Sequence, residues 1–148
     1  MATTVVKQVL ENGPQNYVAS YQINSDGSAL SSYVALDPTS AGDMGVPYGA
    51  SNLYPGTHLK IMRLAYNLPP SLTIRLTWDA SVAQDAWALF GFGKQNFMAQ
   101  GGLFVPQTSL APYVPITGAT GKVFFNMASF TGAANGTIEI WANKDISR

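Results

Sequence analysis

Two aspartates, Asp79 and Asp85, are the best candidates for paired-carboxylate chemistry in this sequence. Asp79 ends the clearest alternation of apolar and polar residues in the chain, and Asp85 follows six residues later. Two carboxylates can act as general acid and general base when a cleft shifts their pKa values apart. Aspartates at strand ends more often solvate turns, so the sequence favours a structural role for both. We therefore expect that the protein is not an enzyme.

The other residue types that could do chemistry form weaker patterns. Asp37 and Asp43 flank a segment rich in Ser and Gly, but the D-x-D-x-D-G spacing of a calcium loop is missing. The sequence contains no G-x-S-x-G motif that would supply a nucleophilic serine for the single histidine, His58. Residues 91–94 (GFGK) lack the spacing of a phosphate-binding loop. Without cysteine, the chain can form no disulfide, thiolate nucleophile or cysteine-based metal site. We expect neither a metal nor a cofactor.

Composition narrows the class of protein further. The chain has 148 residues, of which 47% are hydrophobic and only 11% charged, with eight Lys and Arg against eight Asp and Glu. A net charge of zero counts against nucleic-acid binding, which needs a basic face, and against an electrostatic membrane anchor. No apolar segment predicts a transmembrane helix or a signal peptide, so we expect synthesis in a cytoplasm. A surface this poor in charge is expected to be covered by other subunits.

A hydrophobic period of two predicts strands along most of the chain. Apolar and polar side chains alternate in residues 71–79 (SLTIRLTWD) and again in residues 16–24 (NYVASYQIN). Residues 3–10 carry apolar side chains on both faces, including Val5 and Val6. That segment is therefore either buried on both sides or in contact with a neighbouring chain. Further strands are expected at residues 58–66, 122–128 and 137–143.

Turn-forming residues separate these strands and set the fold class. Gly, Asn and Pro predict turns at residues 12–14, 26–27, 67–70 and 135–136. The one helix candidate, residues 82–89 (VAQDAWAL), is equally compatible with a strand. About seven or eight short strands and no convincing helix predict an all-β fold. We expect one domain over the whole chain, a single antiparallel β-sandwich that is jelly-roll-like.

Two segments, residues 37–57 and 99–121, are long for the loops of a compact sandwich. Both are rich in Gly, Pro, Ser and Thr, yet both contain apolar and aromatic residues that a disordered linker would lack. One interpretation is that they fold back as short edge strands that cap the sandwich, and the other is that contact with a partner orders them. In the second case the expected anchors are Tyr48, Tyr54, Phe104 and Tyr113, and nearby prolines limit the freedom of the loops before binding.

The sequence pattern gives the three tryptophans different expected positions. Trp78 belongs to a buried stripe and is expected in the core, whereas Trp87 has no such assignment. If Ile138 and Ile140 face inward, Trp141 faces outward. An exposed tryptophan is an interface anchor or a platform for a sugar ring, unless it packs under a long loop.

Five short motifs occur in order along most of the chain, at residues 11–18 (ENGPQNYV), 59–64 (LKIMRL), 76–80 (LTWDA), 101–103 (GGL) and 118–123 (GATGKV). Their order resembles that of a group of small structural proteins of tailed bacteriophages, which decorate or cement the capsid. The segment at residues 37–57 is longer here than in that pattern. The resemblance implies a β-sandwich on the outer surface of the virion capsid, made in the host cytoplasm and without catalytic residues.

The resemblance also implies the partners of the protein. It indicates binding where subunits of the major capsid protein meet, and self-association as a homotrimer or a dimer, with neither nucleic acid nor membrane as a partner. Bound across two or more subunits, the domain would add contact area that capsid expansion has to break. The residues expected at these interfaces are Val5, Val6, Tyr48, Tyr54, Trp87, Phe104, Tyr113 and Trp141.

Two alternatives remain open at this point. A carbohydrate- or receptor-binding module of a phage tail or particle surface is the first, since jelly rolls often bind sugars and Trp, Tyr and Asn in loops suit such ligands. A small hydrolase is the second, with Asp79 and Asp85 as its acids.

Overall fold

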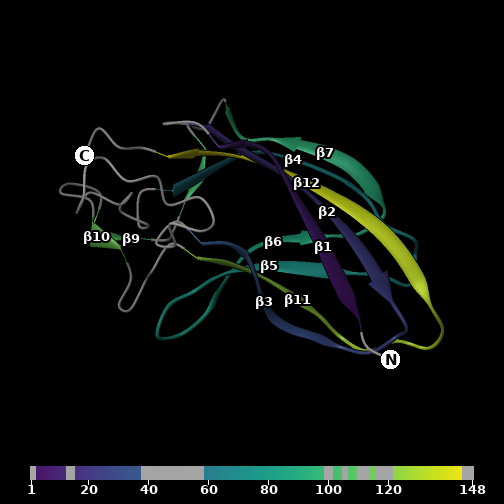
Figure 1. Ribbon diagram of the computed structural model, residues 1–148. Helices are drawn as coiled ribbons and strands as arrows, with labels where there is room; N and C mark the ends of the chain where they lie inside the picture. Colours follow the sequence, from purple (N-terminus) through teal and green to yellow (C-terminus); the bar gives the residue numbers. More distant parts are fainter. Residues whose placement is uncertain are drawn as a thin grey trace.

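The computed structural model describes residues 3–12, 16–37, 59–98, 102–104, 107–109, 114–115 and 122–144. These residues form strands and turns, without an α-helix among them. Two antiparallel sheets face each other (Figure 1). The fold is thus the all-β sandwich that the sequence predicts. Within these ranges no helix is long and apolar enough to cross a membrane.

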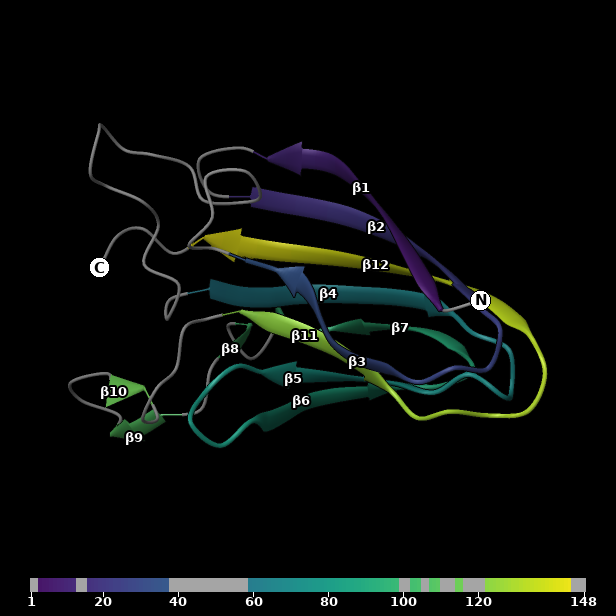
Figure 2. The same ribbon diagram turned by 60° about the horizontal axis from the view of Figure 1, so that its bottom comes forward.

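The larger sheet has six strands, and its long central strands form most of the hydrogen-bonded ladder. Five of them can be followed across the sheet in Figure 2, in the order β1 (Thr4–Asn12), β2 (Asn16–Ser25), β12 (Ala134–Lys144), β4 (Leu59–Asn67) and β7 (Phe92–Asn96). The sixth, β8 (Leu103–Phe104), pairs with β4 beyond the end of β7. β1 and β7 are therefore the opposite borders of this sheet.

The smaller sheet has four strands and covers the inner face of the larger one. Its order is β3 (Leu30–Leu36), β11 (Val123–Met127), β5 (Ile74–Trp78) and β6 (Gln84–Leu89). The chain crosses between the sheets each time it passes from β2 to β3, β4 to β5, β6 to β7 and β11 to β12. A separate pair is formed by β9 (Gln107–Ser109) and β10 (Val114–Pro115).

The core lies between the sheets and follows the predicted alternation. Every second residue of β2 points inward, and Trp78 of β5 is also buried, both as expected. Both sheets contribute branched and aromatic side chains to this layer. Fully buried examples are Tyr17, Tyr21, Ile23, Leu64, Leu76, Phe125, Ile138 and Ile140. This apolar layer is what holds the two sheets face to face.

One predicted turn is wrong, and the reason is packing. Residues 135–136 lie inside β12 and not at a hairpin turn. Gly136 faces the core so closely that a Cβ atom there would come within 2.6 Å of Leu68 Cδ2 and 3.1 Å of Leu72 Cδ2. The chain instead turns near Gly132, whose φ is 101°. Glycine is needed at this position because the two leucines pack closely against it. Turn preferences of the Asn-Gly pair do not reveal such a contact between distant residues.

The ambiguous segment at residues 82–89 contains a strand, β6, and no helix. The strands β3 and β7 are additions to the sequence-based expectation. The alternation of β3 is interrupted because Ser32 has a φ of 53°. The sequence of β7, FGKQN, carries one apolar side chain only and offers no buried stripe.

β1 carries apolar residues on both faces, as the sequence indicates, but the chain does not bury both. Val5 packs partly against the core, whereas Val6 is 57% exposed on the outer face. Val9 and Leu10 are exposed as well, close to a bulge that shifts the register between Val9 and Glu11. The first of the two interpretations of this segment, burial on both sides, therefore fails within one chain.

The two long segments are described only in part. Beyond Asp37, residues 38–57 lie outside the described residues, so the interpretation of that segment stays a prediction. The second segment contributes β8, which extends the border of the larger sheet as a short edge strand. The pair of β9 and β10 also belongs to it.

Candidate functional site

The outer face of the larger sheet carries a grid of polar and aromatic side chains. Cross-strand pairing fixes its rows, because the alternate residues, such as Tyr21 and Ile138, are buried between the sheets. One row runs across Gln8, Ser20, Glu139, Ala65 and Lys94. The next row towards the β2–β3 turn runs across Val6, Gln22, Thr137, Asn67 and Phe92.

A third row contains Trp141, whose indole is held from two sides. Trp141 Nε1 donates a hydrogen bond to the carboxylate of Glu139. The guanidinium carbon of Arg63 lies 4.5 Å from the centre of the Trp141 ring. Trp141 remains 39% exposed while Ile138 and Ile140 face inward, so the prediction that it faces outward is confirmed.

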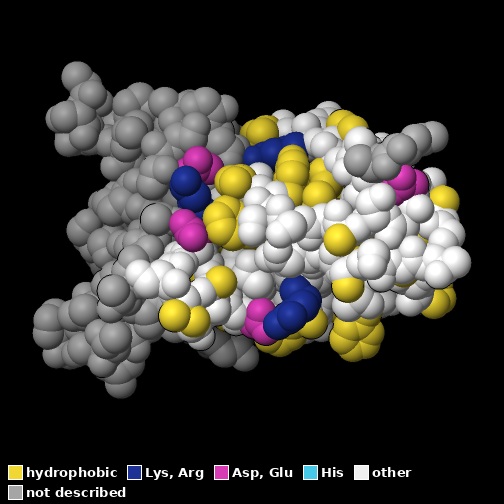
Figure 3. Space-filling model, turned by 90° about the horizontal axis from the view of Figure 1, so that it is seen from below, with side chains coloured by type: hydrophobic (Ala, Val, Ile, Leu, Met, Phe, Trp, Pro, Cys, Tyr) yellow, Lys and Arg dark blue, Asp and Glu magenta, His cyan; other side chains and the backbone are white. Residues whose placement is uncertain are grey.

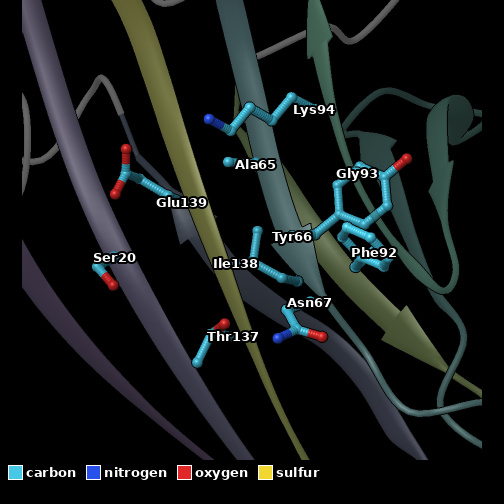
Figure 4. A pocket seen from close by; sticks show the side chains of 10 residues that line it. All are labelled: Ser20, Ala65, Tyr66, Asn67, Phe92, Gly93, Lys94, Thr137, Ile138 and Glu139. Carbon is cyan, nitrogen blue, oxygen red and sulfur yellow. The ribbon is translucent and has the colours of Figure 1, made fainter.

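Between the first two rows lies an elongated hollow of about 450 Å³, which we call the trough. It crosses β2, β12, β4 and β7, and Figure 4 shows the side chains that line it. Ala65 forms part of the floor, because its methyl group leaves space between its larger neighbours. Lys94 reaches over β4 from one side, and Phe92 stands at the β7 end (Figure 4). Phe92 is 84% exposed, the highest value among the large apolar side chains that the structure describes.

A second hollow, of about 280 Å³, lies on the other side of Trp141. Its walls include Val18, Met62 and Met98, with the polar side chains of Asn16 and Arg63 among them. Trp141 and the neighbouring Glu139 therefore stand as a ridge between two hollows of the same sheet face.

Charges of opposite sign are interspersed over the described surface. On the outer sheet face, Glu139 lies in the same row as Lys94 and one row from Arg63. The view in Figure 3 shows Lys and Arg side chains next to Asp and Glu side chains, with apolar groups between them. On the face seen in Figure 3, the basic residues do not form the continuous positive surface that nucleic-acid binding needs.

The candidate carboxylates do not build a site in the described part of the chain. Asp85 forms an ion pair with Arg75, and both side chains are mostly exposed. The backbone amide of Asp79 donates to the carbonyl of Lys122 at 3.0 Å, and neither aspartate lines the trough or the second hollow. Asp43 and His58 lie outside the described residues. Within the described ranges, no three His, Cys, Asp or Glu side chains are grouped so that they could hold a metal ion.

The expected interface residues fall into four groups. Val6 and Trp141 are exposed, whereas Val5 is half-buried. Trp87 is also half-buried and packs edge-to-face on Phe97, with ring centres 5.0 Å apart. Phe104 lies in β8, and only its backbone is described. The remaining three, Tyr48, Tyr54 and Tyr113, lie outside the described residues.

Sequence reasoning missed two phenylalanines that the fold exposes. Phe90 and Phe92 flank Gly91 where the chain passes from β6 into β7, and they are 68% and 84% exposed. The local FGF sequence could have indicated this exposure. Two large apolar residues around a turn glycine do not continue the alternation of a strand, so they do not belong to a buried stripe.

No family model, curated protein or solved structure matches this chain. Its surfaces therefore have to carry the functional argument. They offer a trough with an aromatic end and a few polar side chains on the outer sheet face, and an apolar border at β1.

Proposed function

We propose that this protein is a structural virion protein that decorates and cements a tailed-phage capsid by binding across subunits of the major capsid protein. One observation carries the proposal. Among the described strands β1 pairs only with β2 and so borders the larger sheet, and it exposes Val6, Val9 and Leu10 together.

A border strand with exposed apolar side chains is a typical contact surface for another chain. A border strand offers unpaired N–H and C=O groups, and exposed apolar residues beside them favour association with another chain. Proteins that keep such edges free usually place charges along them. On the exposed side of β1, Val6 and Leu10 occupy positions where a charge would protect the edge.

A second apolar region lies on the opposite side of the sandwich. Phe90 is in the connection from β6 to β7, the two strands that border their sheets on the side away from β1. Two apolar regions on opposite sides suit a protein that touches two subunits at once. Each contact can then be modest, because a second attachment raises avidity by about 10²–10⁴ without stronger individual contacts.

Charge composition supports the same kind of contact. With eight basic and eight acidic residues, the chain has little long-range field for steering. Binding would depend on apolar contact and strand-edge hydrogen bonds. A standard interface buries about 1,600 Å² in total, so several copies around a capsid joint add considerable area that has to be separated on expansion.

The first experiment is antibody labelling of purified virions in the electron microscope. Regular label over the head is the expected result. Label confined to the tail tip would favour receptor binding and overturn the capsid proposal, and absence of the protein from particles would overturn it as well.

A variant pair tests the role of β1 in that attachment. Val6→Asp places a charge in the apolar edge and is expected to lower capsid occupancy at least about tenfold, because a carboxylate would have to be desolvated in the contact. Ser81→Asp adds the same charge at an exposed bend between β5 and β6, on the side of the sandwich away from β1, and should leave occupancy unchanged. Equal occupancy of the two variants would exclude β1 as the contact.

A further inference from the structure

We propose that the trough on the outer face of the larger sheet is a binding site for a neutral oligosaccharide. This inference goes beyond the capsid proposal and does not depend on it. It rests on the side chains that line the trough, on their charge balance and on the way in which the ridge fixes one of them.

The aromatic end of the trough supplies a stacking surface. Phe92 is 84% exposed and is one of the residues that line the hollow, together with Asn67 and Lys94 (Figure 4). An aromatic face carries partial negative charge, which attracts the weakly positive C–H groups on the flat side of a sugar ring. Folding alone gains nothing from a phenylalanine left this exposed, whereas a stacked sugar ring would cover it.

The sides of the trough supply hydrogen-bonding groups of every kind that hydroxyls can use. The Glu139 carboxylate accepts, the Lys94 ammonium donates, and the Asn67 amide does both. Thr137 adds a hydroxyl that can also do both. A sugar hydroxyl is itself donor and acceptor, so neighbouring hydroxyls match such a mixed set better than a purely apolar ligand does.

The charge balance of the trough favours a neutral ligand. Its lining contains one acidic side chain, Glu139, and one basic side chain, Lys94, in the same row on either side of Ala65. A phosphate or carboxylate would gain from Lys94 but would be repelled by Glu139, and the reverse holds for an amine. The volume of about 450 Å³ lies within the range of small-molecule sites, and its extension across four strands suits more than one sugar ring.

The ridge beside the trough holds the acceptor in place before any ligand arrives. The Trp141 indole donates to the Glu139 carboxylate, and the Arg63 guanidinium covers the indole ring. Fixing a side chain in advance reduces the entropy that binding has to remove. The floor is equally fixed, because Ala65 lies in a ladder between β12 and β7.

The test uses the full chain, biotinylated and assembled on streptavidin so that weak contacts add up. A microarray of neutral and acidic oligosaccharides is the probe. We expect binding to a subset of neutral glycans. Phe92→Ala removes the stacking face and should weaken that signal at least about fivefold. Ala65→Leu fills the floor of the trough and should abolish it.

The matched control is Phe90→Ala. Phe90 is the same residue type two positions away, is also largely exposed, and lines neither hollow. This variant should bind glycans like the original chain, and melting curves of all three variants establish that they fold. The proposal is overturned if the original chain binds no neutral glycan, or if Phe90→Ala, Phe92→Ala and Ala65→Leu give equal signals. Preferential binding of acidic glycans would also overturn it. None of these results bears on virion labelling, so the two proposals fail separately.

Discussion

The ammonium group of Lys7 donates a hydrogen bond to the carbonyl oxygen of Ala35 at 2.8 Å and thereby joins the border strands of the two sheets. The hydroxyl of Tyr21 donates to the same oxygen at 2.7 Å. Ala35 is the extra residue of a bulge, because Leu36 pairs with Val123 whereas Val34 pairs with Phe124. A bulged residue is left out of the regular ladder, and two side chains from the opposite sheet here satisfy its carbonyl group.

We expect the two donors to Ala35 to depend on each other. Lys7→Met or Tyr21→Phe alone leaves one donor on the carbonyl oxygen and should lower the free energy of unfolding by about 1–2 kcal/mol. Together they leave a buried acceptor unsatisfied, and the loss should exceed the sum of the single losses by about 1 kcal/mol. Urea denaturation of the four proteins gives the cycle. If the losses in the free energy of unfolding are strictly additive, water replaces both donors at the carbonyl oxygen of Ala35 without a loss of stability.

Gly27 is expected to be the glycine least tolerant of substitution in the turns. Its φ is 98°, and a Cβ atom there would lie 2.4 Å from the carbonyl oxygen of Phe130 and 2.7 Å from that of Gly132, both backbone atoms. Gly27→Ala should therefore cost about 3 kcal/mol or more, by strain and overlap together.

Gly132 provides the matched control, because its φ of 101° is nearly the same but no atom lies within 4 Å of an added Cβ. Gly132→Ala should cost about 1–2 kcal/mol, the conformational strain alone. Thermal melts of both variants measure the difference. Equal losses would mean that the close approach of the two turns is relieved by movement.

The stability of the β2–β3 turn should depend on pH in the acid range. The Ser28 hydroxyl and then the Ser28 backbone amide, at 3.0 Å from Asp26 Oδ1, lower the pKa of the Asp26 carboxyl from its ordinary value of 3.8. Because the folded pKa is the lower one, the contribution of this group is present above 3.8 and is lost as the pH falls through the folded pKa.

An NMR titration of the Asp26 carboxyl carbon checks this directly and should give a midpoint below 3.8. Ser28→Ala removes the hydroxyl and should move the midpoint upwards, while the backbone bond keeps part of the shift. A midpoint at or above the ordinary value in the original chain would contradict the proposed cause.

The ion pair of Asp85 with Arg75 should contribute little to stability. Both side chains are mostly exposed, so solvent screens their attraction, and Asp85→Asn should change the free energy of unfolding by less than about 1 kcal/mol. Leu76→Ala, on the buried face of the adjacent strand, should cost about 2–5 kcal/mol. Chemical denaturation compares the two variants. A large loss for Asp85→Asn would show that the aspartate has a role besides this pair.

The pattern of the sequence is most informative where one strand faces one core. In β2, alternation alone places Tyr17, Ala19, Tyr21 and Ile23 inward, and all four are buried. The outward direction of Trp141 follows in the same way from Ile138 and Ile140. These inferences succeed because the period of a strand is a local property that the apolar residues reveal directly.

The local sequence pattern does not predict the conformation of a segment where contacts with a distant element determine it. The Asn-Gly pair at residues 135–136 looks like a turn, but Leu68 and Leu72 approach Gly136 and keep it within β12. β7 has no apolar stripe and becomes a strand because β4 offers it a ladder. The choice between strand and turn at such places depends on which segments meet, and propensity is a weak guide to that.

The sequence by itself therefore determined the all-β class, the faces of its most regular strands and the absence of cysteine chemistry. Only the tertiary structure decided which strands are neighbours. That decision brings Glu139, Ala65, Lys94 and Phe92 into two adjacent rows and leaves β1 at a border. The physical reason is that the alternation of apolar and polar residues in a strand depends on consecutive residues alone. The strand with which it pairs depends on the packing of the whole sandwich.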